Sequence, residues 1–299
     1  MQASYESLSI ERFPKQCLLA DSWLVRIETP SNQREFLNKQ TLAEDDTGKL
    51  ISQKTREELR AGVLSFERGV GLHFKGLLID FGGTLAYLDE LENKRYEEAL
   101  VSALEKYGRK RLLKEVDDAL AGTYVSSTRG ELKTPQEFWG QVLRKLEVSA
   151  EQDLVSELEA VRRRYISSIW KLYDGVCAAL AVLRKEYRLA LVSNCAVGTD
   201  ELIESLGLDD FFSCKILSYQ VGVRKPDKRM YLEALSCLKL EAHECVFVAD
   251  EISDLEGARE IGLGTMLVWQ GLDTLQGARN ANFKPEFEIS RISEITRLL

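Results

Sequence analysis

The sequence predicts an α/β protein built on a doubly wound parallel sheet, with helices on both faces. Two observations predict this class. Short apolar runs that end at a polar residue or a glycine turn recur along the chain, and helical patterns separate the later runs. A continuous apolar run of this kind is typical of a strand that is buried on both faces. Alternation of such strands with helices implies right-handed crossovers and therefore a parallel sheet.

The first strand is expected at residues 76–81, where an apolar run ends in an acid followed by two glycines. Four further strands are expected at residues 189–193, 215–218, 245–249 and 265–269. Helical patterns between the later strands cover residues 198–206, 228–238 and 254–261. Function in such sheets gathers at the carboxyl ends of the strands, so the residues that directly follow each run are the candidates for chemistry.

A long helical stretch separates the first two strands. Residues 93–107 repeat apolar side chains at helical spacing. Thr134-Pro135-Gln136-Glu137 has the pattern of a capping box with proline at the first helical position, and Ser149-Ala150-Glu151-Gln152 has the pattern of a second box. We therefore expect four helices inserted over about residues 88–170, as a separate helical module over the sheet edge. Additional core helices of the same domain are the alternative.

Residues 1–70 form an N-terminal extension in which we find no chemistry. A strand is expected at residues 24–28, a turn at 44–48 between two short extended pieces, and a helix at 52–64. An accessory subdomain, a dimer element and a docking arm are all compatible with this segment.

Composition excludes several classes of protein. The chain is 44% hydrophobic and 29% charged, and 48 acidic residues against 40 basic ones give a net charge of −8. An acidic chain of this kind argues against nucleic acid as a partner, because phosphate neutralisation needs a basic face. The longest nearly apolar run, residues 176–183, falls far short of the about 20 residues that span a membrane. Residues 1–14 lack the apolar segment of a secretory signal, so we expect a cytoplasmic protein without a membrane partner.

The cysteines and histidines argue against a zinc site and against a disulfide framework. The six cysteines contain no CxxC pair, and the chain has only two histidines. We expect the cysteines to be buried free thiols in a reducing compartment.

Polar residues follow four of the expected strands in turn. Taken singly, each has an ordinary structural explanation as a turn former, a helix cap or a solvated charge. Taken together, carboxylates, a lysine and a hydroxyl at one sheet edge suit Mg²⁺ and a phosphate group, and a carboxylate can also be the nucleophile of phosphoryl transfer. These residues are Asp80, Gly82 and Thr84 after the first strand, Ser193 and Asn194 after the second, Lys225 beyond the third, and Asp250 with Asp254 after the fourth.

In this order the segments resemble the haloacid dehalogenase (HAD) superfamily of Mg²⁺-dependent phosphotransferases. The similar segments are residues 78–85, 191–194, 223–227 and 247–254, and the tail 287–295 resembles the closing strand and helix of the family. The resemblance covers about residues 76–299 and does not reach the N-terminal extension. It implies a Rossmann-like α/β core over 71–87 and 171–299, with residues 88–170 as a helical cap.

The resemblance also implies a nucleophile and a metal site. Asp80 would attack phosphorus and bind Mg²⁺ through its other oxygen, with the carbonyl of Gly82 and the carboxylate of Asp250 as further ligands. Thr84 would brace the turn after the nucleophile. Asp254 would hold a metal-bound water or orient the motif lysine.

The same resemblance implies a phosphate site. Ser193 and the backbone amide of Asn194 would bind the phosphate of the substrate. Lys225 would neutralise both the nucleophile and the phosphoryl oxygens.

One position departs from the phosphatases of this family, which carry an aspartate two residues after the nucleophile where this chain has Gly82. That aspartate protonates the leaving oxygen and then activates the hydrolytic water. Its metal contact is made by the backbone, so glycine keeps the ligand and loses the acid/base. General acid–base catalysis is typically worth about 10²- to 10⁴-fold, or roughly 3 to 5.5 kcal/mol of barrier.

Three functions therefore remain open. The first is a slow phosphatase for a small phosphorylated metabolite with a good leaving group, with Glu251 or an insertion residue as a partial substitute for the missing acid. The second is phosphonatase-like cleavage of a carbon–phosphorus bond, which needs a lysine from the insertion; a dehalogenase fits less well, because Asp250 and Asp254 keep a metal-binding pattern. The third is a Mg²⁺- and phosphate-binding module without turnover. Arg95, Arg129 and Trp139 are possible substrate contacts, but solvated faces and core packing explain them more simply.

Overall fold

The structure is a computed structural model that describes residues 25–28, 34–37, 42–44, 50–52, 74–269 and 283–299. The chain divides into two units, Met1–Gly71 and Leu72–Leu299. Each unit is described by itself.

The first unit contains two short antiparallel strand pairs. Strand β1 (Val25–Glu28) pairs with β2 (Arg34–Leu37), and β3 (Leu42–Glu44) pairs with β4 (Leu50–Ser52). The strand expected at residues 24–28 is confirmed over 25–28, and the two extended pieces around the expected turn are β3 and β4. All but the first residue of the turn expected at 44–48, and all but the first residue of the helix expected at 52–64, lie outside the described residues.

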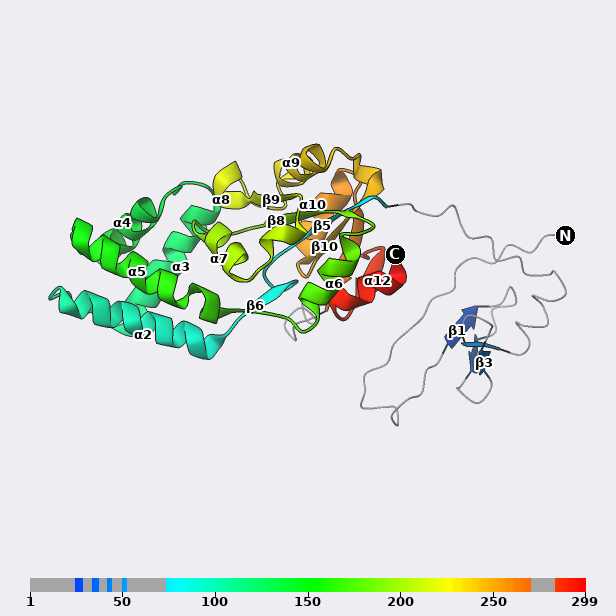
Figure 1. Ribbon diagram of the computed structural model, residues 1–299, viewed down its shortest axis with the longest axis horizontal. Helices are drawn as coiled ribbons and strands as arrows, with labels where there is room; N and C mark the ends of the chain where they lie inside the picture. The colour runs from blue at the N-terminus through cyan, green and yellow to red at the C-terminus, as the bar shows by residue number, and fades with distance from the viewer. Residues whose placement is uncertain (1–24, 29–33, 38–41, 45–49, 53–73, 270–282) are drawn as a thin grey trace. The chain divides into compact units, whose positions relative to one another are not determined.

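The second unit is built on a six-stranded sheet in the order β12-β11-β10-β5-β8-β9, in which every pair is parallel (Figure 1). The predicted fold class is therefore confirmed, and the five strands expected from their apolar runs are all present within one or two residues. The strands are β5 (Gly76–Ile79), β8 (Arg188–Ser193), β9 (Cys214–Leu217), β10 (Cys245–Ala249), β11 (Gly264–Val268) and β12 (Phe287–Ile289).

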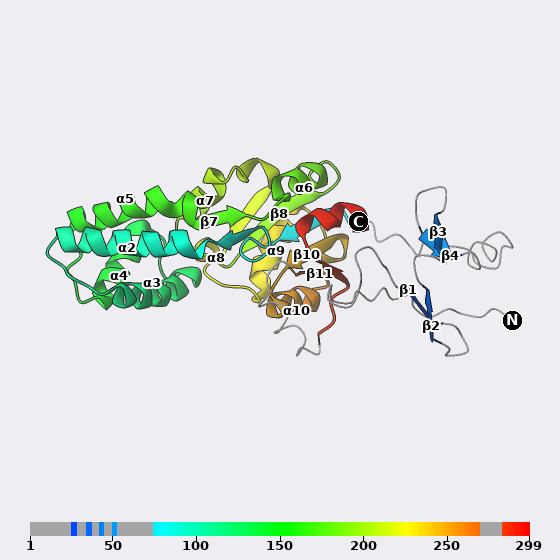
Figure 2. The same cartoon turned by 90° about the horizontal axis from the view of Figure 1, so that it is seen from below.

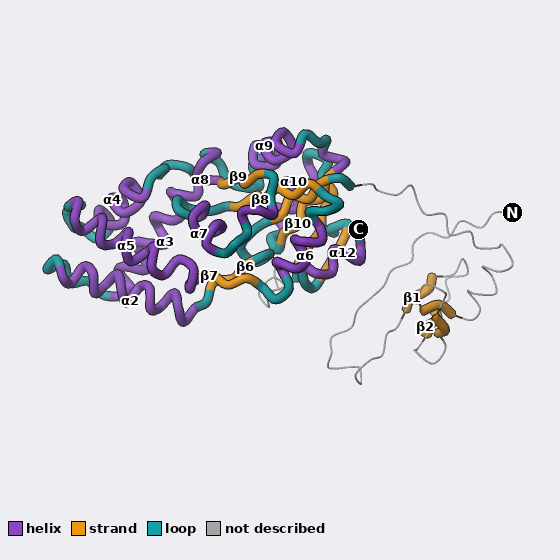
Figure 3. The backbone as a smooth tube through the Cα atoms, viewed as in Figure 1, coloured by secondary structure: helices purple, strands orange, loops and turns teal. Residues whose placement is uncertain are grey.

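The sheet is buried on both faces, as Figure 3 shows by the helices around the strands. In the central strand β5, Leu77 and Ile79 enter one hydrophobic cluster and Leu78 enters another, and all three are fully buried. This alternation follows from the two-residue repeat of a strand. The first cluster is closed by α6 (Val176–Leu183), α7 (Thr199–Ser205) and α12 (Ile295–Leu298), and the second by α9 (Lys228–Leu238) and α10 (Ile252–Glu260).

Four helices are inserted between β5 and β8 and have a hydrophobic cluster of their own, which includes Trp139, Leu143 and Leu158. They are α2 (Glu90–Lys106), α3 (Leu113–Thr128), α4 (Pro135–Lys145) and α5 (Gln152–Ile169). The chain enters and leaves this four-helix insertion through β6 (Ala86–Leu88) and β7 (Trp170–Leu172), which pair antiparallel. Figures 1 and 2 both show the four helices side by side, beyond the edge of the sheet.

The two capping boxes expected in the insertion have different outcomes. The Thr134 hydroxyl accepts a hydrogen bond from the amide of Glu137 at 3.2 Å, and the Glu137 carboxylate accepts one from the amide of Thr134 at 3.0 Å, so the first box is confirmed. The second is wrong, because α5 begins after Glu151 with no side-chain cap. The helix starts at Gln152 with Glu151 at the N-cap position, two residues after Ser149, so Gln152 is the first helical residue and not the third that a box with Ser149 requires.

The expectation of free thiols is wrong for two cysteines. Cys214 of β9 and Cys237 of α9 form a disulfide with an S–S distance of 2.11 Å. The helix packs on the strand so that the two Cα atoms lie 6.6 Å apart, within the range that a disulfide bridges. Cys177, Cys195 and Cys245 are free, and Cys17 lies outside the described residues.

Candidate active site

The predicted site residues lie at the carboxyl ends of four neighbouring strands. The strands β10, β5, β8 and β9 are consecutive in the sheet. Parallel register aligns Ile79 with Val248 and with Leu191, so the residues that follow β5, β8 and β10 emerge at the same edge. The sheet topology therefore brings together the side chains that the sequence distributes over about 175 positions, from Asp80 to Asp254.

Lys225 is the electrostatic centre of this edge. Its Nζ atom lies 2.7 Å from Oδ1 of Asp80 and 3.0 Å from Oδ2 of Asp254, and the lysine side chain is only 1% exposed. The two N–O distances are those of ion pairs. Among the described residues, however, no acceptor is oriented to form a hydrogen bond with the ammonium. It also lies 5.2 Å from the centre of the Phe247 ring. A buried cation whose N–H groups are not used in hydrogen bonds is suited to bind an anion.

The carboxyl of Asp80 is buried and held by the adjacent backbone. Its Oδ1 atom accepts a hydrogen bond from the amide of Phe81 at 2.7 Å, in addition to the ion pair with Lys225. Burial raises the pKa of Asp80 to about 7; the charge of Lys225 opposes this rise, and the carboxylates of Asp254 and Asp250 add to it. A divalent cation beside this carboxyl would lower the pKa again and favour the charged form.

Lys225 itself stays protonated. Burial alone would lower the pKa of Lys225, but the neighbouring carboxylates Asp80 and Asp254 outweigh burial and raise it. The lysine is therefore a permanent positive charge next to Asp80.

Asp250 lies against the turn that follows Asp80. A Cβ atom placed on Gly83 would come within 2.0 Å of Oδ2 of Asp250, and Gly83 has a φ of +73°, which favours glycine. The hydroxyl of Thr84 donates to Oδ1 of the same aspartate at 3.2 Å. The missing side chain at Gly83 thus makes room for a carboxylate beside the turn that follows Asp80.

These donors fit a hard cation that retains water. In the described stretches 74–269 and 283–299, no three side chains of His, Cys, Asp or Glu converge as a metal cluster. The set that the sequence predicts contains two carboxylates, Asp80 and Asp250, and one backbone carbonyl, from Gly82. Mg²⁺ commonly binds through one or two carboxylates and keeps several waters, so a site with few side chains is compatible with it.

The loops after β8 and β9 are tied to each other. The side-chain amide of Asn194 accepts a hydrogen bond from the backbone N–H of Lys225 at 2.7 Å and donates to its carbonyl at 3.1 Å. Ser193, the residue before Asn194, is buried at the end of β8. The hydroxyl of Ser218 accepts from the amide of Cys195 at 2.9 Å. The tethering roles of Asn194 and Ser218 were not predicted, because their partners lie about 25 to 30 positions away in the sequence.

Gly82 faces an aromatic ring. A Cβ atom at this position would lie 3.6 and 3.7 Å from two atoms of the Trp170 indole, an ordinary van der Waals contact. The same indole packs on Phe81 with a centroid distance of 5.4 Å. Trp170 contacts both the cluster under the sheet and the cluster of the four-helix insertion.

The insertion residues singled out in the sequence mostly lie elsewhere. Trp139 is 1% exposed inside the insertion, where its Nε1 atom donates to Glu159, and Arg95 pairs with Glu92 on the surface. Arg129 is exposed. Glu251, the predicted partial substitute for the missing acid, is also exposed.

Two lysines of the insertion that a phosphonatase could use form contacts with other residues of the protein. The ammonium of Lys133 donates to the carbonyls of Tyr219 and Gln220 at 2.6 and 2.9 Å, and Lys106 pairs with Glu157.

Among the described residues of the insertion, Tyr124 of α3 contacts the loop that directly follows β8. Its hydroxyl donates to the carbonyl of Asn194 at 3.3 Å. Sequence reasoning missed it, because a tyrosine on a polar helix carries no signal that distinguishes it from its neighbours.

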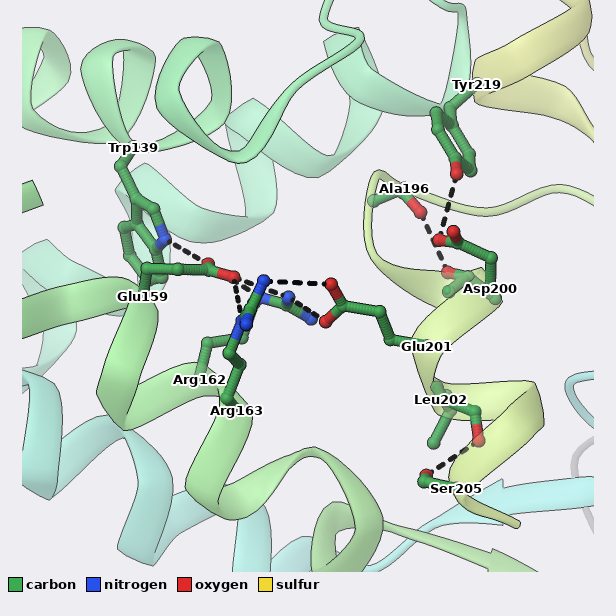
Figure 4. A network of polar contacts seen from close by, with 11 residues as sticks. Trp139, Glu159, Arg162, Arg163, Ala196, Asp200, Glu201, Leu202, Ser205 and Tyr219 are labelled. Carbon is green, nitrogen blue, oxygen red and sulfur yellow. Dashed lines mark hydrogen bonds and ion pairs between the residues drawn. The ribbon is translucent and has the colours of Figure 1, made fainter. Parts of the chain in front are cut away.

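A network of charged residues joins α5 of the insertion to α7 of the sheet layer (Figure 4). Glu201 points from α7 toward Arg162 and Arg163, with N–O distances of 2.6 and 3.1 Å. Arg162 and Arg163 also pair with Glu159, at 2.7 and 3.0 Å. The Arg162 and Glu159 side chains are mostly buried, at 11% and 14% exposed, so this network fixes the insertion against α7.

With the geometry in place, comparison with known proteins identifies the family. The model of the haloacid dehalogenase-like hydrolases matches residues 74–262, which is more than half of the chain. The chain therefore belongs to the haloacid dehalogenase-like hydrolase family, and the prediction of a hydrolase of this family is confirmed.

Named relatives include phosphatases. A glyceraldehyde 3-phosphate phosphatase from Methanopyrus kandleri is 30% identical over 157 residues, which cover 52% of this chain and 67% of that protein. The pyrophosphatase PpaX of Listeria welshimeri is 26% identical over 232 residues, covering 75% of this chain and 95% of the relative. Among solved structures, a 2-haloacid dehalogenase from Pseudomonas syringae pv. Tomato has a TM-score of 0.60 at 20% identity, over 75% of this chain and 97% of that chain, which supports the fold.

None of the helices in the described ranges combines the length and the apolar composition needed to cross a lipid bilayer.

Proposed function

We propose that this protein is a Mg²⁺-dependent phosphatase that acts on a small phosphorylated metabolite through an aspartyl-phosphate on Asp80. The observation that carries the proposal is the buried contact of Lys225 with Asp80 and Asp254, beside Asp250 and the end of β8. A lone buried carboxylate is unfavourable without a partner, so this arrangement indicates a group kept charged for a purpose.

In the proposed reaction, an oxygen of Asp80 forms a bond to phosphorus while the bond from phosphorus to the leaving oxygen breaks. The electron pair of the broken bond stays with the leaving group. Ser193 and the amide of Asn194 bind the phosphoryl oxygens, and Lys225 neutralises them together with the nucleophile. Water then attacks phosphorus, the bond from phosphorus to the Asp80 oxygen breaks with its electron pair returning to the carboxylate, and inorganic phosphate leaves with the oxygen of the water.

Bound Mg²⁺ would be held by Asp80, Asp250 and the carbonyl of Gly82 and would supply positive charge to the developing phosphoryl oxygens. Thr84 supports this site by its hydrogen bond to Asp250. Asp254 holds Lys225 in place through the ion pair on the other side of the ammonium.

The absence of a carboxylate at position 82 restricts the substrates. Without a general acid, the leaving oxygen must depart unprotonated, so leaving groups of low pKa react best. Acyl phosphates, aryl phosphates and phosphoanhydrides satisfy this condition. The name of one relative, a pyrophosphatase, is compatible with this range because pyrophosphate is a phosphoanhydride. Glyceraldehyde 3-phosphate, named for another relative, is an alkyl phosphate and lies outside it.

We also propose that the four-helix insertion, together with β6 and β7, is a cap over the site. Tyr124, Lys133 and Trp170 carry this assignment, because each links the insertion or its connecting strands to the loops at the sheet edge. A covering layer of helices excludes water and favours a small metabolite over a phosphoprotein.

The proposal is tested by hydrolysis of p-nitrophenyl phosphate and acetyl phosphate with and without Mg²⁺. We expect turnover that EDTA removes and Mg²⁺ restores, and that Asp80→Asn abolishes. Lack of turnover by the natural protein on every activated phosphate, with phosphate binding retained, would support the module without turnover and overturn the phosphatase.

A further inference from the structure

Tyr124 brings the four-helix insertion into contact with the proposed phosphate site. Its hydroxyl donates to the carbonyl of Asn194, the residue after Ser193. The side chain of Asn194 in turn bonds the backbone of Lys225 in both directions. The phenol therefore lies next to both loops that are proposed to hold the phosphate.

A second contact fixes the same part of the insertion against the chain that leads to Lys225. A Cβ atom on Gly130 would lie 2.4 Å from the Cα atom of Gly222, so the two backbones touch. The ammonium of Lys133 donates to two carbonyls of helix α8 (Ser218–Val221). The segment from Tyr124 to Lys133 is therefore held at its first residue by the bond to Asn194 and near its last residues by the contacts of Gly130 and Lys133.

Arg224 supplies a positive charge on the loop that is bonded to Asn194. Burial raises the pKa of Tyr124 to about 12 even though the residue as a whole is 44% exposed; Cys195 and Asp80 add to this rise, and Arg224 opposes it. The geometry agrees, because the Asn194 side chain that bonds the backbone of Lys225 belongs to the residue whose carbonyl Tyr124 contacts, and the half-buried Arg224 directly precedes Lys225. In the part of the chain that the structure describes, Arg224 has no ion pair or hydrogen bond through its guanidinium, whereas Arg229 nearby is paired with Asp227.

The charges of the site leave Arg224 available for a ligand. Three carboxylates, Asp80, Asp250 and Asp254, face the single ammonium of Lys225, and the proposed divalent cation would balance the remaining two negative charges. Any further anionic group on the substrate then needs another cation. Arg224 is the residue before Lys225 and can meet this need.

We propose that Arg224 and Tyr124 form a second subsite, which binds an anionic group on the leaving-group side of the substrate. This inference rests on the proposed function and names its substrate class: phosphate compounds whose leaving group carries a carboxylate or a second phosphoryl group. A guanidinium binds either anion through two parallel hydrogen bonds, and the phenol donates a third in place of its long bond to the Asn194 carbonyl. A cation here also stabilises charge on the departing oxygen, which no carboxyl at position 82 can protonate.

The experiment compares Arg224→Gln and Tyr124→Phe with Arg229→Gln as a matched control. Arg229 lies five positions away, and its side chain is 62% exposed. The substrates are phosphoenolpyruvate for the carboxylate, pyrophosphate for the phosphoryl group, and p-nitrophenyl phosphate, whose leaving group carries no additional anionic group. We expect Arg224→Gln to lower kcat/KM about 10- to 100-fold on one or both anionic substrates and less than about threefold on p-nitrophenyl phosphate. Tyr124→Phe should do the same more weakly, and Arg229→Gln should change none.

The anionic substrate whose kcat/KM falls more in Arg224→Gln shows whether the subsite binds a carboxylate or a phosphoryl group. Equal losses on all three substrates, or no loss in either variant, would overturn the subsite.

A binding measurement separates this inference from the proposed function. Calorimetry on Asp80→Asn protein compares 3-phosphoglycerate with glycerol 3-phosphate, and pyrophosphate with inorganic phosphate, and needs no turnover. We expect the more anionic ligand of at least one pair to bind more tightly, and Arg224→Gln to remove that preference. Absence of hydrolysis in the natural protein with this preference intact would refute the phosphatase but not the subsite. Absence of any preference in both pairs would refute the subsite alone.

Discussion

The substitution Gly82→Asp tests the proposed mechanism at the position where this chain departs from its family. The backbone of Gly82 has no left-handed φ, and a Cβ atom there meets only the Trp170 ring at 3.6 Å. The next residue behaves differently, because a Cβ atom on Gly83 would lie 2.0 Å from an oxygen of Asp250. An aspartate is therefore tolerated at position 82 and excluded at position 83.

The expected gain follows from general acid–base catalysis, which contributes about 10²- to 10⁴-fold. The new carboxyl would lie next to Asp80 and Asp250, and burial with like charges raises the pKa of such a group, so that it can donate a proton. The indole of Trp170 limits the positions of this carboxyl, so we expect the lower end of the range. This corresponds to about 10²-fold, or about 3 kcal/mol, on an alkyl phosphate, whose leaving oxygen needs the proton. On an aryl phosphate the gain should stay below about tenfold.

The assay is kcat/KM with Mg²⁺ for glycerol 3-phosphate and for p-nitrophenyl phosphate. Gly82→Asn is the matched control, because it has the same shape and cannot transfer a proton, and it should give no selective gain. In the natural protein we also expect an aspartyl-phosphate that accumulates during turnover and decays faster in Gly82→Asp. Equal gains on both substrates, or none, would refute the reasoning, because another group would then already perform the proton transfer.

Three further predictions concern the interactions that hold the structure together. Lys225→Met leaves two buried carboxylates without their cation and should lower the free energy of unfolding by about 3 to 5 kcal/mol, measured by urea titration; a change below 1 kcal/mol would contradict the burial. Arg162→Met should destabilise by about 2 kcal/mol because its side chain is 11% exposed, whereas Arg163→Met, at 62% exposed, should stay within about 1 kcal/mol; equal effects would contradict the network in Figure 4. Reduction of the Cys214–Cys237 disulfide, which joins residues 23 positions apart, should lower stability by about 3 kcal/mol, and an unchanged thiol titration after reduction would refute the bond.

Local patterns were sufficient for five of the six strands of the sheet, whereas β12 was expected only from the resemblance of the tail to the family. The run at residues 76–81 predicts β5 because a strand buried on both faces has no polar position until it ends, and the structure buries all four residues of β5. The same reasoning predicts β8, β9, β10 and β11. In a parallel sheet the carboxyl ends share an edge, so topology predicted that the loops carrying Asp80 and Lys225 lie at the same edge, and the family resemblance implied their direct contact.

Other elements carried no usable local signal. Helix α6 is an apolar run without a polar face, so periodicity does not identify it as a helix. Strands β6 and β7 have three residues each and form only because they pair with each other. The Ser149 box fails because α5 begins at Gln152, two residues later than the pattern places it, and the sequence pattern does not fix the first residue of the helix.

The amino-acid sequence by itself determined the sheet, the insertion point and the polar residues at the strand ends, because these depend on hydrophobic periodicity and on the order of elements along the chain. Only the tertiary structure decided which insertion residue reaches the site, which cysteines pair and what faces Gly82. Those contacts join residues such as Tyr124 and Asn194, which lie 70 positions apart. Their distance is set by the packing of whole helices and loops, and no local preference of either residue encodes it.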